Sequence, residues 1–483
     1  MRARQDALQQ ELIEIDYELN SARSINRLPP EIMSDILLLV GTNLFQSIDQ
    51  QFGPLPAQYR DARQLWAQVA ALCRRWRQVA NATPALWQRI DVLQKPEWFE
   101  LCLSRCSPLL ADVYLHDEPL FPLLVSSQGR VRRLLAAISG TGVLRSFCFL
   151  ASPCTGLRTL SLRHPHQTLG RSSFTARIPL TKSDFPDVQS LTISGFWVDI
   201  QQSLLTNLRT LVVKQGQRVK YQSMWMDSSR LAKMLHSMPY LEELVLESAF
   251  CLRPSDAQAT LPRLRTLELT GHSEQATRWF VDHVRAPMVS SVVISFLLAS
   301  TSLFVPGGPL FHSLLPNIQV NLPLFFDREA VLVHMEMYSC CITARTKTSL
   351  ISLTYSCPRY PVNTAPALTD LVGLFGPSPL KHLHVSSLFC GAPTEAWSRV
   401  FTQFPDLEHI TLAGHGLHSS LWRALQDTPP SSAKEAVCCS RLRTIEVAGV
   451  TEGGDQDHLP LLQLAISRVL RHRLEREIGR AHV

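Results

Sequence analysis

The sequence has little charge of either sign. Only 18% of its 483 residues are charged, and 47 Lys and Arg against 41 Asp and Glu leave a formal net charge of +6. Nucleic-acid-binding proteins usually concentrate Lys and Arg on one face, so this balance argues against nucleic acid as a partner. Hydrophobic residues make up 45% of the chain, which excludes general disorder and is enough for a large core.

The sequence also lacks the patterns of metal, secretory and membrane segments. Its 12 cysteines are scattered, and Cys340–Cys341 and Cys438–Cys439 are adjacent pairs, which suit neither zinc nor a disulfide. The first residues contain no apolar stretch of the kind a secretory signal needs. In the most apolar window, Met288–Val305, six of the eighteen residues are Ser or Thr, which favours a buried strand over 289–296 rather than a membrane span. We therefore expect an intracellular protein, cytoplasmic or nuclear, with reduced thiols and no metal, cofactor or membrane partner.

Motifs for catalysis are nearly absent. The chain has no G-x-G-x-x-G, Walker, H-E-x-x-H or G-x-S-x-G pattern, and the S-x-x-K match Ser431–Lys434 follows two prolines in an apparent loop. His382 and His384 form an H-x-H pair, which a strand would point to one face. Such a pair could bind a metal if a third ligand approached, but an exposed or hydrogen-bonded histidine pair is the commoner arrangement. We expect a protein that is not an enzyme.

Residues 1–26 have the pattern of one amphipathic helix. Apolar residues recur at alternating steps of four and three among Gln, Glu, Asp and Arg, and they are Leu8, Leu12, Ile15, Leu19 and Ala22. This pattern predicts a coiled-coil seam of two to three heptads. Two interpretations remain open: a helix packed on the domain that follows, or a helix that forms a dimer.

Residues 27–92 predict a small helical domain. A helix should begin at Leu28-Pro29-Pro30-Glu31, because proline suits the first turn and Glu31 complements the helix dipole, and it should end at Gly41. A longer helix is expected from about Ala62 to Asn81. The segment Thr83–Trp87 should add a short helix or turn that brings a bulky aromatic to a three-helix core.

An internal repeat of the form L-x-x-L-x-L fills residues 105–458. Eight clear copies begin at Leu157, Val188, Leu208, Leu241, Leu264, Leu380, Leu407 and Leu442, and weaker copies begin at Leu110, Leu144, Val289 and Leu350. A short strand with its return segment cannot bury its apolar face alone, so such units stack. The pattern predicts an irregular leucine-rich-repeat solenoid with a parallel sheet. The consensus Asn or Cys of such repeats is missing, and the repeats blur over 297–348.

The chain ends in a second amphipathic pattern over 459–483. Leu462, Ile466, Leu470, Leu474 and Ile478 recur at helical spacing, and several arginines lie between them. Because a solenoid needs a cap over its last repeat, we expect a C-terminal capping helix. The predicted fold class is therefore α followed by an α/β solenoid: an N-terminal helix, a three-helix domain, a leucine-rich-repeat horseshoe and a terminal helix.

Three short motifs in residues 27–92 resemble an F-box. They are Leu28-Pro29-Pro30-Glu31-Ile32 with Ile36, then Val69 and Leu72-Cys73-Arg74-Arg75-Trp76, then Leu86-Trp87. The preceding heptad helix and the following repeats also look like the F-box proteins that mushroom-forming fungi carry. The chain departs from the family pattern in an insertion of roughly 25 residues between Val40 and Leu65.

The resemblance implies a function and two sets of residues. F-box domains dock on the Skp adaptor of a cullin-RING ubiquitin ligase, and the rest of the chain presents a target protein. The residues expected to bind the adaptor are Leu28, Pro29, Pro30, Ile32 and Ile36, and those expected in the F-box core are Val69, Leu72, Cys73, Trp76 and Trp87.

The target and the alternatives remain open at the level of sequence. In a solenoid the x positions of the motif share one outward face, so Arg209, Arg265 and Arg443 are candidates for target binding. One alternative is a leucine-rich-repeat scaffold that never enters a ligase. The other is an enzyme with unrecognised motifs, which a deep polar pocket would favour.

Overall fold

The computed structural model describes the greater part of the chain. The described residues are 2–50, 73–92, 96–115, 124, 127–137, 153–163, 178–195, 198–215, 226–253, 255–297, 311, 315, 317–326, 328–336, 338–356, 364–387, 392–414, 418–427, 439 and 441–448. The chain divides into two compact units, residues 1–207 and 208–483, which are described separately. The predicted C-terminal capping helix, the S-x-x-K match and the weak copy at Leu144 lie outside the described residues.

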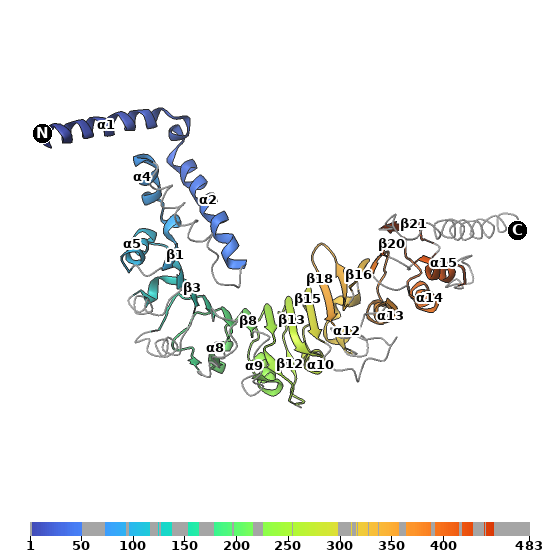
Figure 1. The fold of residues 1–483 in the computed structure, drawn as a ribbon. Coiled ribbons are helices and arrows are strands. Elements are labelled where there is room, and N and C mark those ends of the chain that lie inside the picture. The colour runs from blue at the N-terminus through green and yellow to red at the C-terminus, as the bar shows by residue number, and fades with distance from the viewer. Residues whose placement is uncertain are drawn as a thin grey trace. The chain divides into compact units, whose positions relative to one another are not determined.

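The first unit begins with helices, coloured blue in Figure 1. They are α1 (Arg2–Ala22), η1 (Ser24–Arg27), α2 (Pro30–Gln50), α4 (Arg74–Ala82) and η2 (Pro84–Trp87). The short element predicted over Thr83–Trp87 is thus η2.

Two predicted boundaries in this region are wrong. The helix that should stop at Gly41 continues to Gln50, because one glycine costs a helix interior only about 1 kcal/mol. The helix expected to run through from Ala62 does not include Cys73, whose backbone is extended at φ −158° and ψ 170°, so α4 begins at Arg74.

A parallel sheet completes the first unit. Its strands occur in the order β1-β2-β3-β4-β6, and each pair of neighbours is parallel. The elements are β1 (Arg89–Val92), α5 (Pro96–Cys106), β2 (Ala111–Leu115), η4 (Gln128–Arg130), β3 (Val131–Ala137), β4 (Thr159–Arg163), β5 (Ile178–Leu180), β6 (Ser190–Ser194), β7 (Val198–Ile200) and α8 (Gln202–Leu205). Strands β5 and β7 pair separately.

The second unit is built on a large, mostly parallel sheet. Its strands occur in the order β8-β10-β13-β15-β18-β17-β16-β19-β20-β21. They are β8 (Thr210–Lys214), β10 (Glu243–Glu247), β13 (Thr266–Ser273), β15 (Ser291–Leu297), β16 (Ala330–Glu336), β17 (Ser339–Arg345), β18 (Leu350–Ser356), β19 (His382–Ser387), β20 (His409–Gly414) and β21 (Thr444–Ala448). Four shorter strands form two further pairs: β9 (Met226–Asp227) with β11 (Phe250–Cys251), and β12 (Ala259–Thr260) with β14 (Val284–Arg285).

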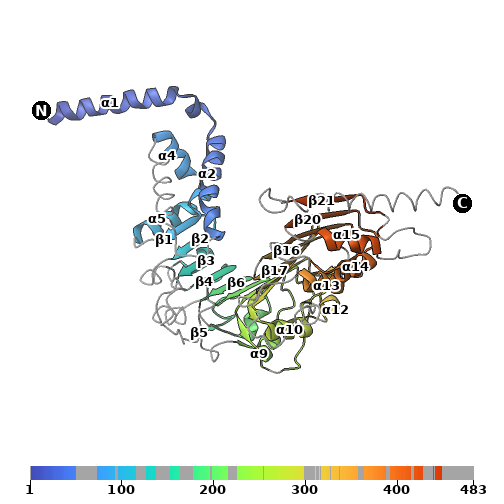
Figure 2. The same cartoon turned by 45° about the vertical axis from the view of Figure 1, so that its right-hand side comes forward.

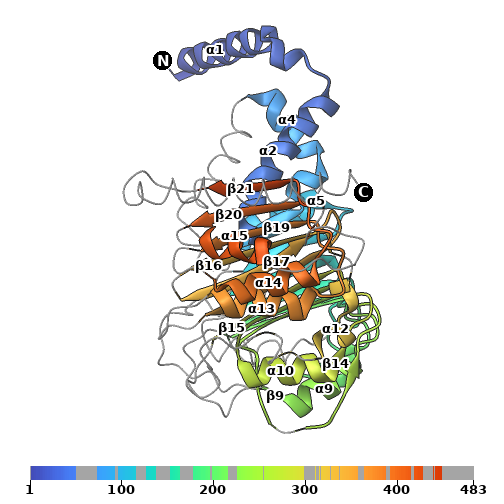
Figure 3. The same cartoon turned by 90° about the vertical axis from the view of Figure 1, so that its right-hand side faces the viewer.

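Helices of the second unit cover one face of this sheet, as Figures 2 and 3 show for the orange and red elements. They are α9 (Ser228–His236), α10 (Glu274–His283), α12 (Ile318–Asn321), η6 (Pro323–Phe326), α13 (Thr364–Phe375), α14 (Thr394–Gln403) and α15 (His418–Asp427). No helix among the described residues is both long and apolar enough to cross a membrane.

The repeated apolar residues face the helices and form the core. In β10 and β13, Leu244, Leu246, Leu267 and Leu269 are at most 1% exposed, and Leu244 lies in register with Leu267. All eight clear copies of the motif lead into strands of the two units' parallel sheets. Ser161 is an exception to the expected pattern. It is an x position of the copy that begins at Leu157 and was expected to face outward, but it is only 4% exposed.

The stretch in which the repeats blur contains a local reversal of the sheet. Strand β17 is antiparallel to both β16 and β18, whereas β18 is parallel to β15 and β16 is parallel to β19. Only two residues separate Glu336 from Ser339, so the chain turns back directly. A parallel neighbour would need a crossover of a dozen or more residues, and none fits here.

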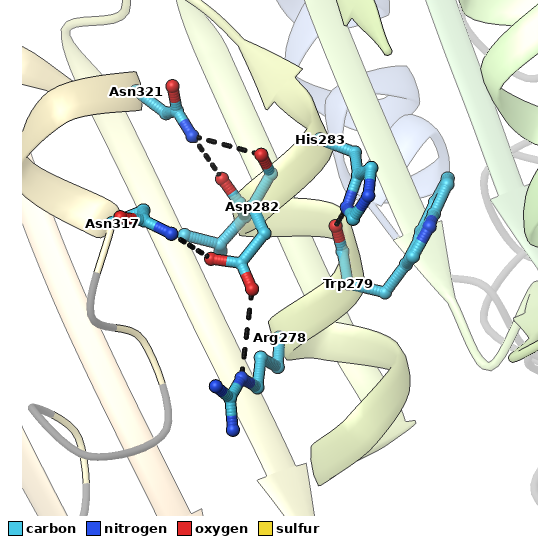
Figure 4. Close-up of polar contacts among 7 residues, drawn as sticks. Arg278, Trp279, Asp282, His283, Asn317 and Asn321 are labelled. Carbon is cyan, nitrogen blue, oxygen red and sulfur yellow. Dashed lines mark hydrogen bonds and ion pairs between the residues drawn. The ribbon is translucent and has the colours of Figure 1, made fainter. Parts of the chain in front are cut away.

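The short helix α12 forms side-chain hydrogen bonds to two other helices, α10 and α13. In α12, the Gln319 side-chain amide donates to the carbonyls of Gly373 and Leu374 at the end of α13, at 2.9 and 2.6 Å. Asn321 likewise donates to the Val281 carbonyl in α10 at 2.7 Å. Figure 4 shows Asn321 and Asn317 beside Asp282 near the end of α10. The Gln319 and Asn321 amides satisfy carbonyls that a helix end leaves without an intrahelical partner.

Candidate functional site

The first candidate site lies on α2, whose two sides differ sharply. Met33 and Leu37 are one helical turn apart and only 2% and 1% exposed. They form a small core with Val79 and Ala80 of α4, against which Trp76 also packs. Since this core fixes the orientation of α2, it also fixes which residues of α2 point away.

The outward side of α2 is apolar. Ile32, Leu39 and Val40 are 46%, 65% and 41% exposed, and Ile36 between them is half-buried. Residues spaced by three and four lie on one face of a helix, so these four form a single surface, which we call the α2 face. Large exposed apolar groups that cluster in this way mark interaction sites.

The predicted adaptor-binding residues belong partly to the α2 face and partly to the core margin. Pro29 and Pro30 are exposed where the helix begins, next to Ile32. Leu28, by contrast, is half-buried and packs against the Met33 core, and its carbonyl accepts a 2.8 Å hydrogen bond from Arg75. Leu39 and Val40 were not among the predicted site residues, although their spacing from Ile32 and Ile36 is a helical signal.

Of the residues predicted for the F-box core, those that the structure describes differ in how deeply they are buried. Val69 and Leu72 lie outside the described residues, and Cys73 and Trp76 are half-buried. Trp87 is 4% exposed, and its indole N–H donates to the Ala80 carbonyl at 2.7 Å. Met33 and Leu37, the buried residues of α2, were missed because their apolar neighbours in the sequence hide which face is buried.

Contacts around Trp87 join the helical region to the following sheet. The rings of Trp87 and Trp98 of α5 have their centroids 5.9 Å apart, and the Arg105 guanidinium lies 4.4 Å from the centre of the Trp87 ring. These aromatic and cation–π contacts favour one arrangement of η2 on α5.

The second candidate site is the sheet face that carries the three predicted target-binding arginines. Arg209 and Glu242 stand side by side just before β8 and β10, joined by a 3.0 Å ion pair and by a backbone hydrogen bond from the Glu242 N–H to the Arg209 carbonyl. The Arg265 N–H donates in turn to the Glu242 carbonyl at 2.8 Å. Neighbouring strands therefore alternate in charge along this row.

The same alternation recurs further along the second unit. Lys381 forms a 2.8 Å ion pair with Glu329, and this hydrogen bond lowers the pKa of the Glu329 carboxyl. The Glu408 N–H donates to the Lys381 carbonyl, and the exposed Arg443 donates to Glu408 in the same way. We call these seven residues the charged row: Arg209, Glu242, Arg265, Glu329, Lys381, Glu408 and Arg443. Its alternating signs suit a protein surface with complementary charges better than a polyanion.

The described residues were compared with what a metal site needs. No group of three or more His, Cys, Asp or Glu residues among them could hold a metal ion. The third ligand that the His382–His384 pair would need is absent from this part of the chain, and His382 instead stacks on His409, with ring centroids 4.8 Å apart. Burial raises the pKa of the Cys102 thiol to about 12, so this thiol is not a ready nucleophile.

One comparison with known proteins finds a family in the residues that carry the first site. A protein-family model described as F-box-like matches residues 25–92, which include most of η1 and all of α2, α4, η2 and β1. No curated protein matches the chain. The chain therefore contains an F-box-like domain, which supports an F-box protein, followed by large, mostly parallel sheets. F-box domains in general bind the Skp adaptor of cullin-RING ligases, so this domain points to a ubiquitin-ligase adaptor role.

Proposed function

We propose that this chain is a substrate-recognition adaptor of a cullin-RING ubiquitin ligase. In this proposal the F-box-like domain docks on the Skp adaptor, and the strands that follow act as a leucine-rich-repeat-like surface for a target protein. The chain itself supplies no catalysis, which belongs to the ligase.

The observation that carries the proposal is the α2 face within the F-box-like match. Ile32, Leu39 and Val40 are exposed although Met33 and Leu37 of the same helix are buried. A helix that needed only its own core would gain nothing from a second apolar side, whereas a partner helix could cover it. Apolar anchors at the centre of an interface carry most of its binding free energy.

Copurification with the Skp adaptor tests this docking. The double variant Ile32→Asp with Leu39→Asp should lose the adaptor by more than about 30-fold in affinity, which corresponds to roughly 2 kcal/mol. Ser34→Ala, on the same helix but two residues from Ile32 and five from Leu39 and therefore off the α2 face, is the matched control and should bind like the wild type. Wild-type copurification of the adaptor with the double variant, at unchanged helical content, would place docking elsewhere.

A scaffold that never enters a ligase is the second candidate. The regular pairing of the strands and the charged row fit either function, because both need a surface that binds proteins. Affinity purification with mass spectrometry separates them: a ligase adaptor brings down the Skp adaptor and a cullin together with its targets, whereas a scaffold brings down targets alone.

A further inference from the structure

The N-terminal helix α1 has a continuous apolar side that is open to solvent. Leu8, Leu12, Ile15 and Leu19 are 55%, 63%, 48% and 63% exposed. Their spacing places them at successive a and d positions of a heptad repeat, and we call them the α1 seam. The sequence left open whether this helix packs on the following domain or forms a dimer. Packing on the following domain does not bury these four residues.

The helix needs a partner for physical reasons. It spans 21 residues, and most of the stability of a helix in a protein comes from packing of its amphipathic face rather than from intrinsic propensity. Its charges also do not stabilise its own dipole, since the first turn has no acidic residue and the last turn has no basic residue. A second helix along the α1 seam would bury the four aliphatic side chains and stabilise α1.

The flanking charges argue against a second copy of α1 as this partner. In a parallel pair, Glu11 at a g position faces Asp16 at the e position of the other helix. In an antiparallel pair that sets Leu12 against Ile15, Glu11 instead faces Glu18 of the other helix. Like charges meet in both orientations, and such pairs oppose association.

The net charge of α1 indicates what the partner carries. Residues 2–22 contain two basic residues, Arg2 and Arg4, and five acidic residues, which are Asp6, Glu11, Glu14, Asp16 and Glu18, so the helix has a net charge of 2 − 5 = −3. We propose that the α1 seam is a docking site for a basic amphipathic helix of another protein. Aliphatic residues of that helix pack on Leu12 and Ile15, and its Lys or Arg side chains lie beside Glu11.

Binding of defined peptides to the full-length protein tests the proposal. The probe is a labelled synthetic 21-residue peptide with Leu and Ile at a and d and Lys at e and g, followed by fluorescence anisotropy. It should bind saturably and weaken as salt is raised. Two matched peptides, one with Glu at e and g and one with Ser at a and d, should bind at least about tenfold more weakly, because each lacks one of the two required features.

Variants of the protein locate the binding on the α1 seam. Leu12→Ser with Leu19→Ser should abolish binding of the basic peptide, and Glu11→Lys should weaken it while strengthening binding of the Glu peptide. Gln10→Ala, exposed on the opposite side of α1, should change nothing. Deleting residues 1–22 should leave copurification of the Skp adaptor intact, so failure of this proposal and failure of the proposed function are separable.

Three results would overturn the assignment. The first is no saturable binding of the basic peptide. The second is a wild-type dimer in light scattering that Leu12→Ser dissociates, which would assign the seam to a second copy. The third is tighter binding of a peptide of residues 459–480, an arginine-rich amphipathic segment of this chain, than of the basic probe.

Discussion

The indole N–H of Trp76 donates a 2.7 Å hydrogen bond to the side-chain oxygen of Asn26, fifty residues earlier in the chain. Asn26 is only 6% exposed, and its amide group donates in turn to the Asn20 carbonyl at 2.6 Å. One buried amide thus joins the end of α1, through η1, to α4 of the F-box-like domain.

Replacing Asn26 should therefore destabilise the F-box-like domain. Asn26→Ala leaves the Trp76 indole N–H without its acceptor, and an unpaired group of this kind costs about 1–3 kcal/mol when it is kept from water. Urea unfolding followed by tryptophan fluorescence measures the change. Gln9→Ala, on the exposed surface of α1, is the control, and an unchanged midpoint in Asn26→Ala would show that the bond contributes nothing.

The two residues that open the F-box motif should respond differently to substitution. Pro29→Ala changes an exposed side chain and should weaken adaptor binding without unfolding, whereas Leu28→Ala also removes packing from the Met33 core. The double variant should lose adaptor binding while the second unit stays folded, as read by hydrogen exchange in β10 and β13. Retained capture of the Skp adaptor by the double variant would remove both residues from the interface.

The sequence pattern anticipated features that depend on periodicity, and it missed those that depend on a neighbour far along the chain. The leucines at Leu244 and Leu267 recur in a fixed motif, so their burial in parallel strands could be predicted. His272 could not, because a bulge after Thr270 shifts the register and turns this ring into the core. The same holds for the reversal at β17, since alternation of polar and apolar residues does not encode strand direction.

His272 should make the second unit sensitive to acid. The ring is 2% exposed, and burial lowers its pKa to about 4, so the folded protein keeps it neutral. The unfolded chain takes up a proton near pH 6.5, and stability should therefore fall as the pH drops from about 6.5 towards 4, with a total loss of about 3 kcal/mol. Well above pH 6.5 the group makes no contribution to the pH dependence.

Thermal unfolding at pH 7.5 and 5.5 measures this effect. His272→Phe keeps a ring against Phe250, whose centroid lies 4.3 Å away, and should reduce the loss of stability at the lower pH. His236→Gln, an exposed histidine of α9, should leave the loss as it is in the wild type. Equal losses in the wild type and His272→Phe would contradict the assignment.

Gln319 should stabilise the end of α13. Gln319→Ala removes two hydrogen bonds to helix-end carbonyls, and each bond contributes about 1 kcal/mol. Amide hydrogen exchange in α13 should become faster, and the midpoint of urea unfolding of the second unit should fall to a lower urea concentration. Its neighbour Val320 is 70% exposed, so Val320→Ser is a control in the same helix that should change neither.

Charge reversal on the charged row tests where a target protein binds. Arg209, Arg265 and Arg443 each present an exposed guanidinium before a strand, but Arg209 is already paired with Glu242. Exposed pairs of this kind contribute about 1 kcal/mol or less, so reversal should alter the surface field far more than stability. We expect the triple variant with Glu at all three positions to capture less target in quantitative affinity purification, with adaptor copurification unchanged.

A charge-swapped variant separates the field of the charged row from its internal pairing. Arg209→Glu with Glu242→Arg preserves the ion pair and reverses only the order of its charges, so the fold keeps the contact while a partner meets the opposite pattern. If recognition depends on charge order, this variant should lose target as the triple variant does. If it captures the full set of targets, the ion pair belongs to the structure of the sheet edge and the target binds elsewhere.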